Sequence, residues 1–297
     1  MGGGSWTNSS YSDYISTSRG TTVDNFSKSK YTVQEVYKSR RLDPMLDPKN
    51  VIRQCHDSEE HPESLPVILA LDVTGSMGSA SMRVAQKLNE IMTSIYDNKS
   101  VKDVEFCVMG IGDLVYDDSP IQISQFESDV RIAEQLDKLY FEGGGGGNTY
   151  ESYTAAWYMG TYRSDLHCWK RGKKGIIITL GDECPNPYLP ARELKCCLGD
   201  IKTQGDIETK ALLEEAREKF DIYHIAVDDY DSSYRYHNNS HNLDEKWKEL
   251  LGEENFFVSN LDNLAATITN IIINREEENV VSGAAPFTLN ENNEIVW

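Results

Sequence analysis

Asp72, Thr74 and Ser76 could build a site for a hard divalent cation. They occupy every second position after Val67–Leu71, an apolar run typical of a strand buried on both faces. One carboxylate and two hydroxyls would then project from a single turn. Hard cations such as Mg²⁺ prefer oxygen ligands and keep positions open for water or another molecule's oxygen. A strand-end turn that caps a helix uses the same residue types, so the prediction needs further ligands.

Two later loops offer more oxygen ligands. Thr149 and Glu151 follow the glycine run 143–147, and Asp182 lies just beyond the apolar run 175–180. In a doubly wound sheet, ligands bind beyond the carboxyl ends of the strands, so these loops are expected to meet the first one.

The second loop allows more than one role for its residues. We expect Thr149 at or near a helix start, where hydroxyls are common caps. Glu151 is expected either as a direct or water-mediated ligand or as a first-turn carboxylate favoured by the helix dipole. Asp113 and Glu183 are expected beside the same edge, behind the ligands.

The surrounding pattern alternates strands and helices. Strands are expected at 67–71, 104–111, 121–126, 175–180, 222–227 and 256–258, and helices at 83–96, 128–140, 150–161, 206–220, 243–251 and 261–273. The loop before the third strand is too short for a helical crossover, so this strand should be antiparallel. The alternation predicts an α/β fold with a Rossmann-like, doubly wound, mostly parallel sheet.

Other segments surround this pattern. Residues 1–64 are expected to form an N-terminal extension or arm with a short helix at 31–41, residues 65–275 the domain, and residues 276–297 a C-terminal tail. Within the domain, 184–205 is expected to be an insertion and 229–242 a polar surface loop.

The three oxygen-bearing loops resemble the metal-ion-dependent adhesion site (MIDAS) of von Willebrand factor A (vWA) domains. In that family the first loop reads Asp-x-Ser-x-Ser, and Thr74 keeps the hydroxyl of the middle serine. The resemblance covers about residues 65–275 and implies the sheet order 3-2-1-4-5-6 with the third strand antiparallel. It also implies Mg²⁺ or Mn²⁺ held by Asp72, Thr74, Ser76 and Thr149, and by Asp182 through water, with a partner's Asp or Glu carboxylate completing the shell.

Two further similarities refine this resemblance. The run Asn148-Thr149-Tyr150-Glu151 is similar to integrin β-subunit domains and some bacterial members, in which a glutamate near this position ligates the metal. The glycine run and the Ser/Tyr-rich arm at the start of the chain resemble prokaryotic and phage members.

Composition restricts the classes of partner. The net charge of −19 argues against nucleic acid, because phosphates repel an acidic surface, and is compatible with divalent cations or basic partners. No apolar run approaches the about 20 residues that span a bilayer, so no membrane partner is expected. The first residues lack the pattern of a signal peptide, and the six cysteines are expected to be reduced thiols in a cytoplasmic protein.

Other kinds of site receive less support from the sequence than the cation site. No Gly-Lys-Ser/Thr follows the glycine run, which argues against a phosphate-binding P-loop, and Thr74 stands where a nucleophile elbow needs glycine. A zinc site could use His167, Cys168, Cys184, Cys196 and Cys197, but no Cys-x-x-Cys pair is present. Tyr234, Tyr236, His237 and His241 are interpreted as a polar loop or as part of a partner surface.

The resulting hypothesis is a non-enzymatic, divalent-cation-dependent protein-interaction module. One alternative is a structural or assembly protein that binds through its N-terminal arm, with a metal that only stabilises it. The other is a Mg²⁺-dependent phosphotransferase, because haloacid-dehalogenase-like enzymes also begin with an aspartate after a buried strand. Those enzymes carry a second aspartate where this chain has Thr74, and another acid where it has Asn186 and Pro187.

Overall fold

The structure of the protein is a computed structural model that describes residues 4–98, 101–143, 148–230, 232–283, 288–289 and 295–296, with side chains up to residue 277. Its centre is a six-stranded sheet in the order β12-β11-β7-β2-β3-β4. These strands are β2 (Leu65–Asp72), β3 (Val104–Ile111), β4 (Ile121–Ile123), β7 (Gly175–Gly181), β11 (Phe220–Val227) and β12 (Phe256–Ser259). β4 pairs antiparallel to β3, and the other pairs are parallel.

This sheet confirms the predicted fold class. Numbered within the sheet, its strands follow the order 3-2-1-4-5-6, with the third strand antiparallel as expected. Every residue of β2, β3 and β7 is buried, because helices cover both faces.

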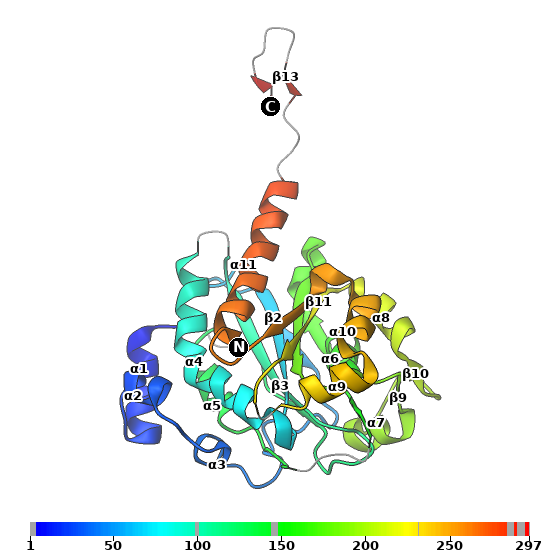
Figure 1. Ribbon diagram of the computed structural model, residues 1–297. Helices are drawn as coiled ribbons and strands as arrows, with labels where there is room; N and C mark the ends of the chain where they lie inside the picture. Colours follow the sequence, from blue (N-terminus) through cyan, green and yellow to red (C-terminus); the bar gives the residue numbers. More distant parts are fainter. Residues whose placement is uncertain are drawn as a thin grey trace.

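Helices form a layer on each side of the sheet (Figure 1). The first layer contains α4 (Gly78–Asp97), α5 (Arg131–Leu136) and α11 (Leu264–Gly283). The second contains α6 (Thr154–Tyr162), α7 (Ala191–Leu198), α8 (Thr209–Arg217) and α10 (Leu243–Leu251). Within the described residues, no helix is long and apolar enough to cross a membrane.

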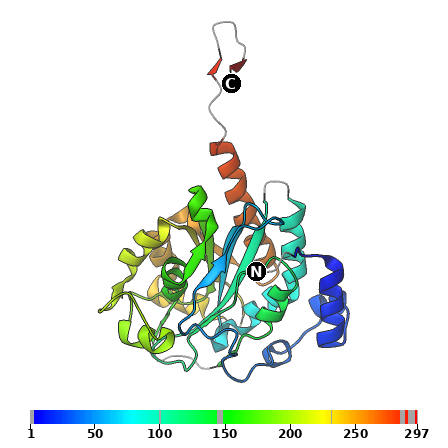
Figure 2. The same cartoon turned by 180° about the vertical axis from the view of Figure 1, so that it is seen from behind.

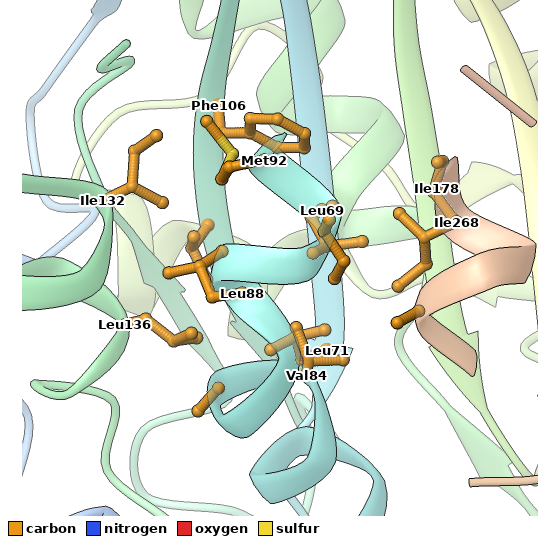
Figure 3. Close-up of a cluster of buried hydrophobic side chains, with 14 of the residues drawn as sticks. Leu69, Leu71, Val84, Leu88, Met92, Phe106, Ile132, Leu136, Ile178 and Ile268 are labelled. Carbon is orange, nitrogen blue, oxygen red and sulfur yellow. The ribbon is translucent and has the colours of Figure 1, made fainter. Parts of the chain in front are cut away.

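Successive side chains of β2 point to opposite faces of the sheet, and the core is accordingly divided into two clusters. Leu69 and Leu71 face the first helical layer, whereas Ile68 and Ala70 face the second. Figure 3 shows the first cluster, in which the apolar side chains of α4 point at the sheet and those of α5 lie beside them. This packing fixes the end of β2, where Asp72 lies.

The N-terminal extension is part of this core. It forms α1 (Asn8–Arg19), α2 (Val23–Lys28) and α3 (Val33–Val36), and Figure 2 shows α1 and α2 beside α4. Its buried side chains join the first cluster: Trp6, Tyr11, Ile15, Phe26, Val36, Tyr37 and Leu46. Arg19 and Tyr14 both contact Asp137 after α5. Near the end of the extension, β1 (Arg53–Cys55) pairs in parallel with β6 (Ser164–Leu166).

Several predicted elements were wrong. Residues 229–242 are not a loop throughout, because α9 (Tyr234–His241) forms there and buries Tyr234 and His237. The helix expected at 31–41 is only the single turn α3, and that expected at 128–140 is only α5. The insertion contains α7 and the short strand β9 (Tyr188–Leu189), which pairs with β10 (Ile207–Glu208) just beyond the insertion. In the expected tail, α11 continues to Gly283, before the pair β13 (Thr288–Leu289) and β14 (Ile295–Val296).

Candidate functional site

The site begins where β2 ends. Asp72 is fully buried, and its Oδ1 accepts hydrogen bonds from the backbone N–H of Thr74 at 2.9 Å and from the Thr74 hydroxyl at 2.6 Å. The chain then enters the short 3₁₀ turn η1 (Gly75–Met77), which leads directly into α4. The predicted alternation of carboxylate and hydroxyl therefore forms one compact turn at the carboxyl edge of the sheet.

A second loop reaches this turn from β7. The hydroxyl of Ser76 donates a hydrogen bond of 3.2 Å to Oδ1 of Asp182, although 106 positions separate the two residues. Oδ2 of Asp182 accepts the backbone N–H of Ser233, and the residue is fully buried. The structure thus brings together the loops after β2 and β7, which were predicted to form one site.

The phenol of Tyr153 completes the surroundings of Asp72. It donates to Oδ2 of Asp72 at 2.8 Å and accepts the backbone N–H of Glu183 at 3.3 Å. The ring is fully buried and packs edge-on against His224 and Trp247, with centroid distances of 5.2 and 5.6 Å. The residue therefore bridges the β2 and β7 loops from behind. This role is not apparent from the sequence, because an aromatic residue near an apolar helix is more simply explained by core packing.

Glu151 lies in a strand rather than in a helix. Residues 150–151 form β5, which pairs in parallel with β8 (Cys184–Pro185) and so places Glu151 opposite Pro185, just past the β7 loop. The expectation that Thr149 begins a helix is therefore wrong, since this pairing holds the chain extended and α6 starts only at Thr154. Of the preceding glycine run 143–147, only Gly143 lies inside the described residues.

The Glu151 carboxyl group is buried without full hydrogen bonding. The residue is 5% exposed, and its Oε2 has no hydrogen-bond partner within the described part of the chain. Burial, followed by the charge of Asp72, raises the pKa of Glu151 to about 11. An unpaired buried carboxyl oxygen beside other acids is a costly arrangement that a bound cation would relieve.

The loop after β3 supports the same edge. Asp113 accepts a 2.6 Å hydrogen bond from the side-chain amide of Asn148, and the backbone N–H of Leu114 donates to Ser152 at 3.0 Å. Asp113 thus anchors the start of the second loop. Thr149, next in the chain, is half-buried, and no side-chain hydrogen bond links it to Asp72 within the described residues.

Glu183 connects the site to α9. Its Oε1 lies 2.8 Å from Nε2 of His237, and both side chains are largely buried. Burial and the neighbouring charges of Asp182 and Asp72 raise the pKa of Glu183 to about 8, while burial lowers the pKa of His237. Both shifts disfavour the charged forms of the two groups.

The acids at the core of the site repel one another. Burial, then the charge of Asp182, raises the pKa of Asp72 to about 7, and burial also raises the pKa of Asp182. No group of three or more His, Cys, Asp or Glu side chains among the described residues is arranged to hold a metal ion by itself. A cation here would therefore need further oxygens, which the Thr74 and Ser76 hydroxyls can supply. Such a set of oxygens fits a hard divalent cation.

Comparisons with known proteins rest on structure alone. No protein-family profile and no curated protein matches the sequence. The SpaC pilus adhesin of Lactobacillus rhamnosus GG superposes with a TM-score of 0.49 at 13% identity, covering 77% of this chain but 31% of the adhesin. This chain therefore spans about a third of that protein's length.

Two other solved structures have a similar arrangement. Proximal thread matrix protein 1 of the mussel byssus, solved with a zinc-occupied MIDAS motif, gives a TM-score of 0.44 at 10% identity, with 76% of this chain and 48% of that chain covered. The vWF domain of the type V pili tip protein Mfa5 of Porphyromonas gingivalis gives 0.44 at 13% identity, with 77% and 98% covered. The structures similar to this chain thus include a vWF domain and a protein with a MIDAS motif.

Proposed function

We propose that this protein is a divalent-cation-dependent protein-interaction module. Asp72, Ser76 and Asp182 would hold Mg²⁺ or Mn²⁺, with the Thr74 hydroxyl turned from Asp72 toward the ion. Thr149 and Glu151 would contribute from the β5 side, directly or through water. An incomplete shell would leave the cation free to accept an Asp or Glu carboxylate of a partner protein.

The observation that carries this proposal is the hydrogen bond between Ser76 and Asp182. It shows that the oxygen-bearing loops after β2 and β7 meet at one edge of the sheet. The unsatisfied Glu151 oxygen supports it, because the charge of Asp72 acts on this carboxyl and its Oε2 has no hydrogen-bond donor among the described residues.

The proposed partner chemistry follows from charge. The chain has a net charge of −19, and buried acids surround the site. A partner's carboxylate would be repelled by this edge unless a cation stood between them. Binding of an acidic group here should therefore depend strictly on the metal.

The two alternatives receive less support. Tyr11, Ile15 and Phe26 of the arm are buried in the first core cluster, so these side chains are not available to a partner in the folded protein. In a phosphotransferase of this type, Thr74 would have to take the place of the second aspartate as general acid and base. Its hydroxyl donates a hydrogen bond to Asp72 and does not gain or lose a proton near neutral pH. Turnover of phosphomonoesters in the presence of Mg²⁺ that vanished in Asp72→Asn would overturn the non-enzymatic assignment.

The proposal can be tested by affinity capture from the native cell. Immobilised wild-type protein is expected to retain a partner with Mg²⁺ and to release it on chelation, and Asp182→Asn is expected to retain none. Asp262→Asn serves as a matched control, because this side chain is 88% exposed on another loop. If the wild type, Asp182→Asn and Asp262→Asn retain the same partners with and without chelator, then partner binding does not use the proposed cation site.

A further inference from the structure

A second, oppositely charged site lies at the other end of the sheet. A cavity of about 340 Å³ opens where β2 and β7 begin, whereas Asp72 and Asp182 follow the ends of these strands. Five basic residues line it: Lys102, Arg171, Lys173, Lys174 and Arg275. Its buried floor includes Leu65 and Cys168, which are 6% and 1% exposed.

The charge of this cavity departs from that of the whole chain. The protein contains 29 basic and 48 acidic residues, so acids should predominate in an ordinary stretch of surface. The lining of the cavity carries five cations and two acids, Glu63 and Glu276, while Asp57 and Asp221 pair with the arginines from outside the lining. The contrast indicates a local positive potential inside a concave, partly apolar site, where field lines are focused.

The two arginines form the fixed wall of the cavity. Arg171 contacts Asp57 and donates to the Ser64 carbonyl at 2.8 Å, and Arg275 donates to Asp221 at 2.8 Å. These pairs neutralise much of the guanidinium charge and hold the side chains in place. They leave the lysines as the groups available to a ligand.

The lysines are less constrained. Lys102 and Lys173 are exposed and have no acidic partner within 4.0 Å in the part of the chain that the structure describes. Lys174 has only a loose contact, with Nζ 3.8 Å from Asp221. Three ammonium groups with free donors therefore surround one opening, in a protein that otherwise carries a large negative charge.

We propose that this cavity binds a small polyvalent anion, either a phosphate-bearing molecule or a polycarboxylate. Ammonium groups act as compact charges with three donors each, which suits tetrahedral phosphate and clustered carboxylates alike. The cavity volume lies in the range of small-molecule sites. Anion binding in this cavity is independent of the proposed cation site, because the two sites share no residues.

The test is calorimetric titration of the full chain with inorganic pyrophosphate and, in a separate arm, with citrate. The protein is first freed of divalent cations, so that neither anion can bind through a metal at the opposite edge. Wild-type protein should bind at least one of the two with a stoichiometry of one. The double variant Lys102→Glu/Lys173→Glu should bind it at least about tenfold more weakly, because two nearby attractions become repulsions.

A charge-matched control separates a site from general electrostatics. Lys28→Glu/Lys210→Glu changes the net charge by the same amount at lysines that are 73% and 70% exposed and lie elsewhere. This control should bind like the wild type. Pyrophosphate binding alone would assign a phosphate ligand, and citrate binding alone a polycarboxylate. Absence of binding by both, or equal losses in the two double variants, would overturn the proposal.

Discussion

The phenol of Tyr153 donates a 2.8 Å hydrogen bond to Oδ2 of Asp72, on the opposite side of the carboxylate from Thr74. The carboxylate is therefore held in one orientation by groups on both of its oxygens. This contact also ties the β2 loop to α6, because Tyr153 immediately precedes that helix. The orientation of the proposed metal ligand thus depends on a residue that need not touch the metal.

Tyr153→Phe should weaken cation binding without unfolding the protein. The ring keeps its packing, while Asp72 loses one of its orienting donors, and such outer hydrogen bonds commonly change metal affinity by about 10–100-fold. Mg²⁺ titration by calorimetry measures the change. Tyr158→Phe is the control, since the Tyr158 hydroxyl is also buried but bonds to Lys202 on another side of the fold. Equal affinities in wild type and Tyr153→Phe would show that this contact is not needed.

Gly181→Ala should disturb the same contact by steric overlap. A Cβ atom at Gly181 would lie 1.8 Å from the Tyr153 hydroxyl, so the ring or the β7 loop must shift. Overpacking of this kind costs about 1–3 kcal/mol of stability, and the cation affinity should fall as well. Gly205→Ala is the matched control, because nothing lies within 4 Å of its added Cβ. Thermal unfolding of both variants decides whether the effect is local to the site.

The stability of the cation-free protein should fall as the pH rises from about 4 to about 8. Burial raises the pKa of Asp72 to about 7 and that of Glu183 to about 8, whereas unfolded carboxyls titrate near pH 4. The folded state therefore retains protons that the unfolded chain has lost, and the free energy of unfolding decreases through this range. Melting temperatures measured in chelator test this, and saturating Mg²⁺ should flatten the decline. A melting temperature that rises over this interval would contradict the assignment.

The N-terminal extension should behave as part of the fold. Ile15 is 1% exposed in the first core cluster, so Ile15→Ala is expected to lower the free energy of unfolding by about 2–5 kcal/mol. Ile52→Ala removes the same atoms from a residue that is 58% exposed and should cost far less. Denaturant unfolding provides the comparison. If Ile15→Ala were as stable as the control, the extension would be free to act as an independent binding arm.

Much of the fold could be predicted because the central strands are buried on both faces. The largely apolar segments 67–71, 104–111 and 175–180 predict strands that are buried on both faces. Their carboxyl ends share one edge of a parallel sheet, which is why Asp72, Ser76 and Asp182 could be placed together from their order in the chain.

The remaining parts depend on tertiary contacts that a local pattern does not encode. β5 forms because residues 150–151 pair with β8, a contact that is distant in the sequence. The local pattern alone therefore predicts a helix there. The polar segment of α9 has just two buried side chains, Tyr234 and His237, too few to give a clear helical period. Tyr153 reaches Asp72 through packing against His224 and Trp247, which lie far away in the sequence.

The most direct test of the central claim is calorimetric titration of Mg²⁺ and Mn²⁺ into wild-type protein and Asp72→Asn. Asparagine preserves the shape and one of the two hydrogen-bonding oxygens at this fully buried position, while it removes the charge that would hold the ion. Wild-type protein is expected to bind one cation, and Asp72→Asn to bind it at least about tenfold more weakly with an unchanged fold by circular dichroism. Unchanged cation binding in Asp72→Asn, or no binding in the wild type, would contradict the account.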